Sequence, residues 1–102
     1  MAYDKVEGLL DDTDTTDAII GEGQFDVVVE GLTSGSIKLQ YKLPKVKDSV
    51  IYDPDWVDFP DGEFVTDVYK TVFISEAGVF LRALGSGNNS GVYVRIAKHL
   101  IR

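Results

Sequence analysis

The residues best suited to acid–base chemistry are carboxylates in one short stretch. Two carboxyl groups on opposite sides of a cleft can act as general acid and general base, as in glycoside hydrolysis. No spacing within the stretch indicates that two of its members face each other, and 102 residues leave little room for a deep cleft. We therefore expect no enzyme activity and no catalytic residue. The carboxylates concerned are Asp53, Asp55, Asp58, Asp61 and Glu63.

A second acidic run, residues 11–17, carries four aspartates. A calcium loop of the EF-hand type needs a glycine at its sixth position and a glutamate at its twelfth. A loop that starts at Asp11 has Thr16 in place of the glycine, and one that starts at Asp12 ends on Gly23. Neither register satisfies the motif, so we expect no metal site and no cofactor.

The other candidate groups are isolated. His99 is the only histidine and there is no cysteine. These residue types provide neither a zinc site nor a convincing nucleophile–base pair. The glycine-rich residues 85–91 lack the Lys-Ser/Thr pair and the helix of a phosphate-binding loop, so we expect a hairpin tip there.

Four aromatic side chains leave two interpretations open. They could form a flat platform for sugars, as in carbohydrate-binding modules. Alternatively, the tryptophan packs in the core and the tyrosines line its edges. The residues are Tyr52, Trp56, Tyr69 and Tyr93.

The net charge of −7 is divided into zones. Residues 1–30 carry nine acids and one base, residues 31–47 carry four lysines and no acid, and residues 48–67 carry seven acids and no base. The acidic excess repels phosphates, so we expect no nucleic-acid partner. Alternating blocks can match each other within one chain or between neighbouring copies, which makes a homo-oligomer, a trimer in particular, a second expectation.

Hydrophobic patterning points to an all-β chain. Apolar side chains at every second position, as in residues 24–30 and 36–43, are typical of strands with one buried face. The Ser-Gly turns before residues 36 and 92 favour hairpins, and a pairing of the first two runs would fix their register. No apolar run is long enough to cross a membrane. The expected core residues are Phe25, Val27, Val29, Ile37, Leu39, Tyr41, Leu81, Val92 and Val94.

Seven or eight short strands predict one antiparallel β-sandwich or jelly-roll-like domain over residues 18–102. Residues 44–60 contain three prolines and are expected to be mostly irregular. Residues 1–17 are too acidic to bury themselves, and we expect an extended N-terminal arm there. Expected protein-interaction residues lie in the arm and in the charge blocks. They are Val6, Leu9, Leu10, Lys45, Lys47, Asp55 and Asp58.

Several segments together resemble a known group of proteins. They are Gly-Glu-Gly-Gln-Phe-Asp-Val (21–27), Gly-Leu-Thr-Ser-Gly-Ser-Ile-Lys-Leu-Gln (31–40), Phe-Leu-Arg-Ala (80–83) and Ser-Gly-Val-Tyr-Val-Arg-Ile (90–96). This order resembles small β-sandwich proteins encoded among the structural genes of tailed bacteriophages. The chain departs from that pattern where residues 44–55 precede Trp56.

The resemblance implies a virion structural protein without catalytic residues, made in the cytoplasm of the host bacterium. Its expected role is capsid decoration (cement), with the major capsid protein or another virion protein as partner. The alternatives are a tail or fibre accessory domain, or a carbohydrate-binding module for adhesion to the host.

Overall fold

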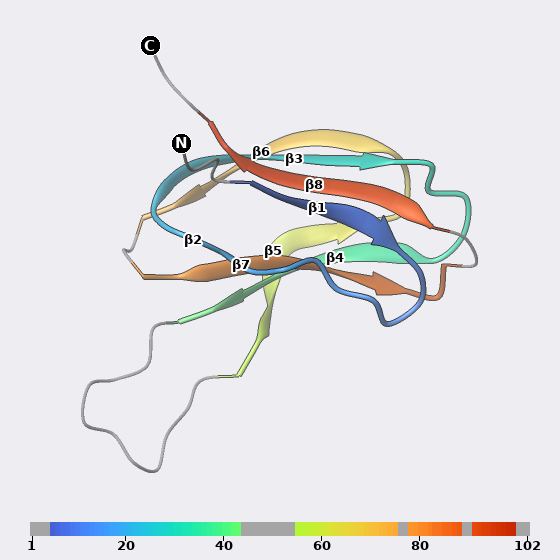
Figure 1. The fold of residues 1–102 in the computed structure, drawn as a ribbon, viewed down its shortest axis with the longest axis horizontal. Helices are drawn as coiled ribbons and strands as arrows, with labels where there is room; N and C mark the ends of the chain where they lie inside the picture. The colour runs from blue at the N-terminus through green and yellow to red at the C-terminus, as the bar shows by residue number, and fades with distance from the viewer. Residues whose placement is uncertain (1–4, 44–54, 76–77, 89–90, 100–102) are drawn as a thin grey trace.

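The computed structural model describes residues 5–43, 55–75, 78–88 and 91–99. These residues form eight β-strands and no helix, so none of them belongs to a helix that could span a membrane. The strands build two antiparallel four-stranded sheets, which lie as two layers in Figure 1. They are β1 (Lys5–Leu10), β2 (Ile19–Ile20), β3 (Gly23–Glu30), β4 (Ser36–Lys42), β5 (Val57–Phe64), β6 (Val68–Ile74), β7 (Phe80–Ser86) and β8 (Val92–Lys98).

The first half of the chain pairs in reverse order with the second half. β1 pairs with β8, β2 with β7, β3 with β6, and β4 with β5. The pairings β3–β8 and β4–β7 complete the sheets, whose strand orders are β1-β8-β3-β6 and β2-β7-β4-β5. Strands β5 and β6 are therefore edge strands, one in each sheet.

The core lies between the two layers and confirms most of the expected apolar rows. Of the nine residues expected there, eight are no more than 1% exposed. Tyr41 is half-buried and packs against the core from its edge. The period-two pattern succeeds because a strand buries alternate side chains whichever strand lies next to it.

The expected hairpin between residues 24–30 and 36–43 is wrong. β3 and β4 lie in different sheets, so their apolar rows meet across the core rather than along one face. The turn between them is nevertheless tight. Gly35 has φ +70°, and a Cβ there would come 2.4 Å from the carbonyl carbon of Gly87, so only glycine fits.

The expected irregular stretch ends earlier than predicted, because Pro60 lies inside β5. The register between β4 and β5 shifts between Lys38 and Gln40, whose partners are Glu63 and Asp58. An edge strand tolerates such an interruption, since it needs ladder hydrogen bonds on one side only.

An extended arm over residues 1–17 is not confirmed. Lys5–Leu10 forms β1 and pairs along its whole length with β8, and Leu10 is 2% exposed. Residues 11–17 are polar as expected, yet they follow the edge of β7. The backbone amide of Thr16 donates to the carbonyl of Ala83, and the Ala83 amide donates to the Thr16 hydroxyl. Hydrogen bonds with β7 thus satisfy backbone groups of this acidic segment. The alternation of apolar and polar residues along the sequence could not predict these bonds.

Candidate functional site

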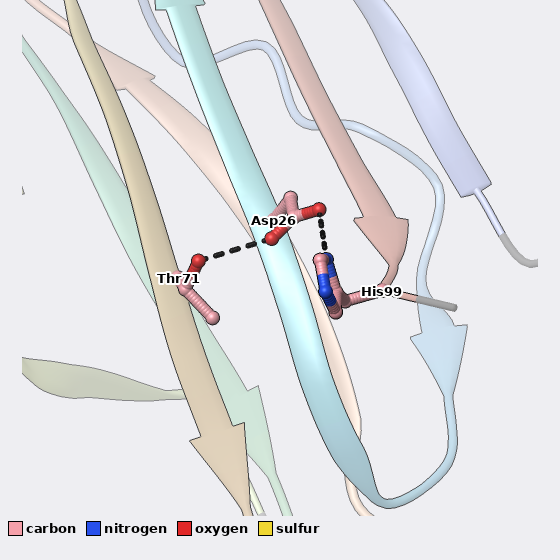
Figure 2. Close-up of polar contacts among 3 residues, drawn as sticks. All are labelled: Asp26, Thr71 and His99. Atoms are coloured by element: carbon pink, nitrogen blue, oxygen red, sulfur yellow. Dashed lines mark hydrogen bonds and ion pairs between the residues drawn. The ribbon is translucent and has the colours of Figure 1, made fainter. Parts of the chain in front are cut away.

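The outward face of the β1-β8-β3-β6 sheet carries a carboxylate held from two sides (Figure 2). The Thr71 hydroxyl, on β6, donates to Oδ1 of Asp26, on β3, over 3.0 Å. Nδ1 of His99, just beyond β8, lies 2.9 Å from Oδ2 of Asp26. A carboxylate only accepts, so this hydrogen bond requires the ring proton on Nδ1. The Asp26 side chain is therefore fixed across three strands.

The surroundings of Asp26 favour its charged form. Partial burial raises the pKa of Asp26, whereas the hydrogen bonds from His99 and Thr71 lower it. The charge of His99 and the hydroxyl of Tyr69 lower that pKa further. The net result is a pKa below the ordinary aspartate value, so Asp26 is ionised at neutral pH.

A hollow of about 380 Å³ lies beside this carboxylate. Sheet register explains its shape. Val28 has Arg95 on one side and Tyr69 on the other, and Asp26 has Ala97 on one side. Small apolar side chains thus form the floor, and longer polar or aromatic ones surround it. The lining consists of Asp26, Val28, Tyr69, Arg95, Ala97, Lys98 and His99.

The arrangement around Asp26 does not form a nucleophile–base–acid relay. In such a relay the hydroxyl sits at the histidine nitrogen that faces away from the carboxylate. Here the Thr71 hydroxyl donates to Asp26 itself, on the side opposite His99 (Figure 2). The three residues can therefore orient a carboxylate for binding, but their order does not activate Thr71.

A second feature is an apolar groove between edge strands β5 and β6, of about 160 Å³. Two of its lining residues, Leu43 and Phe73, are exposed, Phe73 to 65%. Tyr41 and Phe59 meet edge-to-face within it, with ring centroids 5.8 Å apart. Its lining is Tyr41, Leu43, Phe59, Pro60, Phe73, Ile74, Ser75 and Val79. Large exposed apolar groups gathered in this way are typical of an interaction surface.

The outward face of the other sheet holds a chain of polar contacts. Nε of Arg82 donates to Oε1 of Gln40 over 3.0 Å, and Nε2 of Gln40 donates to Oδ1 of Asp58 over 3.1 Å. The Arg82 guanidinium lies 4.2 Å from the centre of the Trp56 ring. Burial lowers the pKa of Arg82. These side chains satisfy one another and stabilise this face of the sheet.

Three of the five carboxylates considered for acid–base chemistry do come together. Asp58, Asp61 and Glu63 line a hollow of about 400 Å³ together with Lys38. Lys38 stands directly opposite Glu63 in the β4–β5 pairing, which supports charge neutralisation within one chain. Within the described ranges, no group of three or more acidic or histidine side chains is placed to hold a metal ion. Asp53 lies outside the described residues.

The aromatic residues do not form one platform. Trp56 is half-buried on one sheet, with Arg82 over its ring, so it does not occupy the core. Tyr69 and Tyr93 project from the outward face of the other sheet, Tyr69 with 70% exposure. The Tyr93 hydroxyl donates a hydrogen bond to Glu7. Burial is the larger cause, and this hydrogen bond the next, of a raised pKa of Tyr93. Tyr52 lies outside the described residues.

Of the residues predicted for protein interaction, those that the structure describes do not converge. Val6 packs against the core and Leu10 belongs to it, whereas Leu9 is 68% exposed. Asp55 is exposed just before β5. Lys45 and Lys47 lie outside the described residues. Asp58, described above, is engaged with Gln40.

Sequence reasoning missed the site around Asp26. One signal was present, because an acid in the run Phe25–Val29 has to occupy the outward side of that strand. His99 was judged isolated because its partner lies 73 positions away. Comparisons of the chain with family models, with curated proteins and with solved structures found no match.

Proposed function

We propose that this chain is a non-enzymatic structural protein of a tailed-phage virion that binds the outer capsid surface and stabilises it. The proposal rests on the sequence resemblance, on the strand order and on the apolar groove between β5 and β6. Of these, the groove is the observation that carries a binding role. The major capsid protein is the proposed partner.

The strand order supports a jelly-roll-like fold. In a jelly roll, eight strands form two four-stranded sheets in which the first half of the chain pairs with the second half in reverse order. The pairs β1–β8, β2–β7, β3–β6 and β4–β5 follow this arrangement. Viral capsid proteins and lectins both use this fold. This part of the support is an analogy between folds, since one fold serves many functions.

The groove supports attachment to a protein. Phe73 and Leu43 expose apolar surface beside a hollow whose other walls, apart from Ser75, are aromatic or aliphatic. Burial of a large aromatic side chain in a partner's surface contributes much of the affinity of typical interfaces. The two edge strands also leave backbone groups at their outer sides, which a partner can cover.

Electron microscopy and mass spectrometry of virions, with and without this gene product, test the proposal. We expect the wild-type chain in purified particles and as density on the capsid exterior, and we expect particles that lack it to release their genome at lower temperature. Phe73→Asp should abolish co-sedimentation with particles that lack the chain, because a charge in the groove opposes its burial.

Tyr69→Asp is the matched control, since Tyr69 is equally exposed on the same face of β6 but outside the groove. It should leave co-sedimentation unchanged. Absence of the chain from purified wild-type virions would contradict the proposal. Density confined to the tail would indicate a tail or fibre role instead of capsid decoration. Equal loss of binding in both variants would show that the groove is not the specific contact surface.

A further inference from the structure

The hollow beside Asp26 has a chemistry separate from that of the groove between β5 and β6. It opens on the outward face of the β1-β8-β3-β6 sheet, and Phe73 does not line it. Its polar groups come from three adjacent strands, whose spacing of about 4.8 Å brings them around one small ligand. Capsid attachment through the groove makes no use of them.

Asp26 offers a fixed acceptor to this hollow. A carboxylate has about four lone-pair positions on its two oxygens. Thr71 takes one position on Oδ1, His99 takes one on Oδ2 and the Tyr69 hydroxyl takes a third, so about one position is left for a ligand. These contacts also remove the rotational freedom that a ligand would otherwise have to freeze. A hydroxyl group of a ligand is a donor that suits the remaining position.

Tyr69 and Arg95 supply complementary groups on either side of Val28. The Tyr69 ring is 70% exposed, and its hydroxyl lies close enough to lower the pKa of Asp26, so the ring borders the carboxylate. Arg95 is exposed and its guanidinium carries five donors but no acceptor. Val28 and Ala97 form an apolar floor between them.

The geometry points to a saccharide-binding site, in which Asp26 accepts a hydrogen bond from one ring hydroxyl, Arg95 donates to a further sugar oxygen and Tyr69 stacks on the apolar face of the ring. A pyranose combines these features, since its hydroxyls lie at the rim and its C–H groups on the faces. Inorganic phosphate is the competing ligand, since Arg95 and Lys98 in the lining attract an anion whereas the ionised Asp26 repels it. A site of this kind suits adhesion to glycans on a cell surface and is independent of capsid attachment.

Nuclear magnetic resonance titration of the full chain with the methyl glycosides of glucose, galactose and mannose tests this inference. At least one of them should shift the backbone amides of Asp26, Val28 and Arg95 selectively, with a Kd of about 1 mM. Tyr69→Ala and Asp26→Asn should each weaken that binding about tenfold, by loss of the stacking surface and of one charged acceptor. The amide spectra of both variants report directly whether the fold is kept.

Phe73→Ala is the matched control, because it removes a similarly exposed aromatic from the same face of β6 outside the hollow. It should leave saccharide binding unchanged. No selective shift with any of the three glycosides at 50 times that Kd would overturn the inference. The inference would also be overturned if inorganic phosphate shifts these amides and none of the glycosides does, because that result would identify an anion site. Neither result depends on whether the chain binds capsids.

Discussion

Asp26 shows how one side chain reports on the packing of three strands. Its hydrogen bonds with Thr71 and His99 join β3 to β6 and to the residue after β8. Together with the charge of His99 and the Tyr69 hydroxyl, they outweigh the effect of partial burial and lower the pKa of the carboxyl group. A lowered pKa in the folded state means that ionised Asp26 contributes to stability.

This linkage predicts a pH dependence for Asp26→Asn. The contribution of Asp26 is present above the pKa of an unfolded aspartate, about 3.9, and is lost as the pH falls through the lower folded-state value. We expect the variant to be about 1 kcal/mol less stable than wild type at pH 6 and nearly equal to it at pH 2. Denaturant unfolding at both pH values measures the difference.

Asp17→Asn provides the comparison, because Asp17 is exposed. Its effect on stability should be small, within about 0.5 kcal/mol. A constant difference between wild type and Asp26→Asn over the same range would show that the ionised carboxylate does not stabilise the fold.

At the scale of elements, β1 is the main revision of the sequence-based view. The acidic composition of residues 1–17 predicts an arm outside the folded domain. Instead, β1 pairs with β8 over six positions and places Leu10 in the core. The segment that follows then satisfies backbone groups of β7 at Ala83 and Gly85. This passage from one sheet to the other ties both layers together at one end of the chain.

Removal of residues 1–17 should therefore prevent cooperative folding, because it exposes one edge of β8 and opens the core at Leu10. A milder test is Leu10→Ala, which should cost about 2–5 kcal/mol of unfolding free energy. Leu9→Ala is its control, since Leu9 is 68% exposed and its loss should cost less than about 0.5 kcal/mol. Urea denaturation followed by tryptophan fluorescence measures all three.

The opposite result is equally clear. If residues 18–102 alone unfold cooperatively at the wild-type urea midpoint, β1 is not an integral strand. Residues 1–17 would then be an extended arm, as the sequence predicts.

At the scale of the whole molecule, the alternating charge blocks remain the basis for proposing self-association. Lys38 is the register partner of Glu63 in the β4–β5 pairing, so one member of the basic block lies beside an acid of the same chain. Asp55 is exposed and available to another copy. We propose that three copies close into a ring at a capsid symmetry axis, with Lys45 and Lys47 of one copy near acidic residues of the next.

Contacts of this kind weaken with salt, because the Debye length is only about 8 Å at physiological ionic strength. Occupancy on particles should fall several-fold between 50 and 500 mM salt, and Lys45→Glu combined with Lys47→Glu should reproduce that loss at low salt. Lys5→Glu, on β1 of the other sheet, is the control and should bind normally. Quantitative gel analysis of sedimented particles gives the occupancy. Salt-independent occupancy, or isolated single copies in electron micrographs, would contradict the ring.

The sequence by itself determined the main inward rows of the core and that the chain is all-β. Alternation is a local property, so Phe25, Val27 and Val29 are recognisable as one inward row without knowledge of the neighbouring strands. The turn at Gly35 is visible for the same reason, since the backbone conformation that needs glycine is local.

Only the tertiary structure decided which strands pair and which polar residues meet. The choice of sheet for β3 and β4 depends on contacts far along the chain, and a period-two pattern is equally satisfied by neighbours in one sheet or by rows facing across a core. The same holds for Asp26, which is polar wherever it lies and becomes part of a site only when β6 and β8 bring Thr71 and His99 to its two oxygens. Long-range pairing, rather than residue type, creates that site.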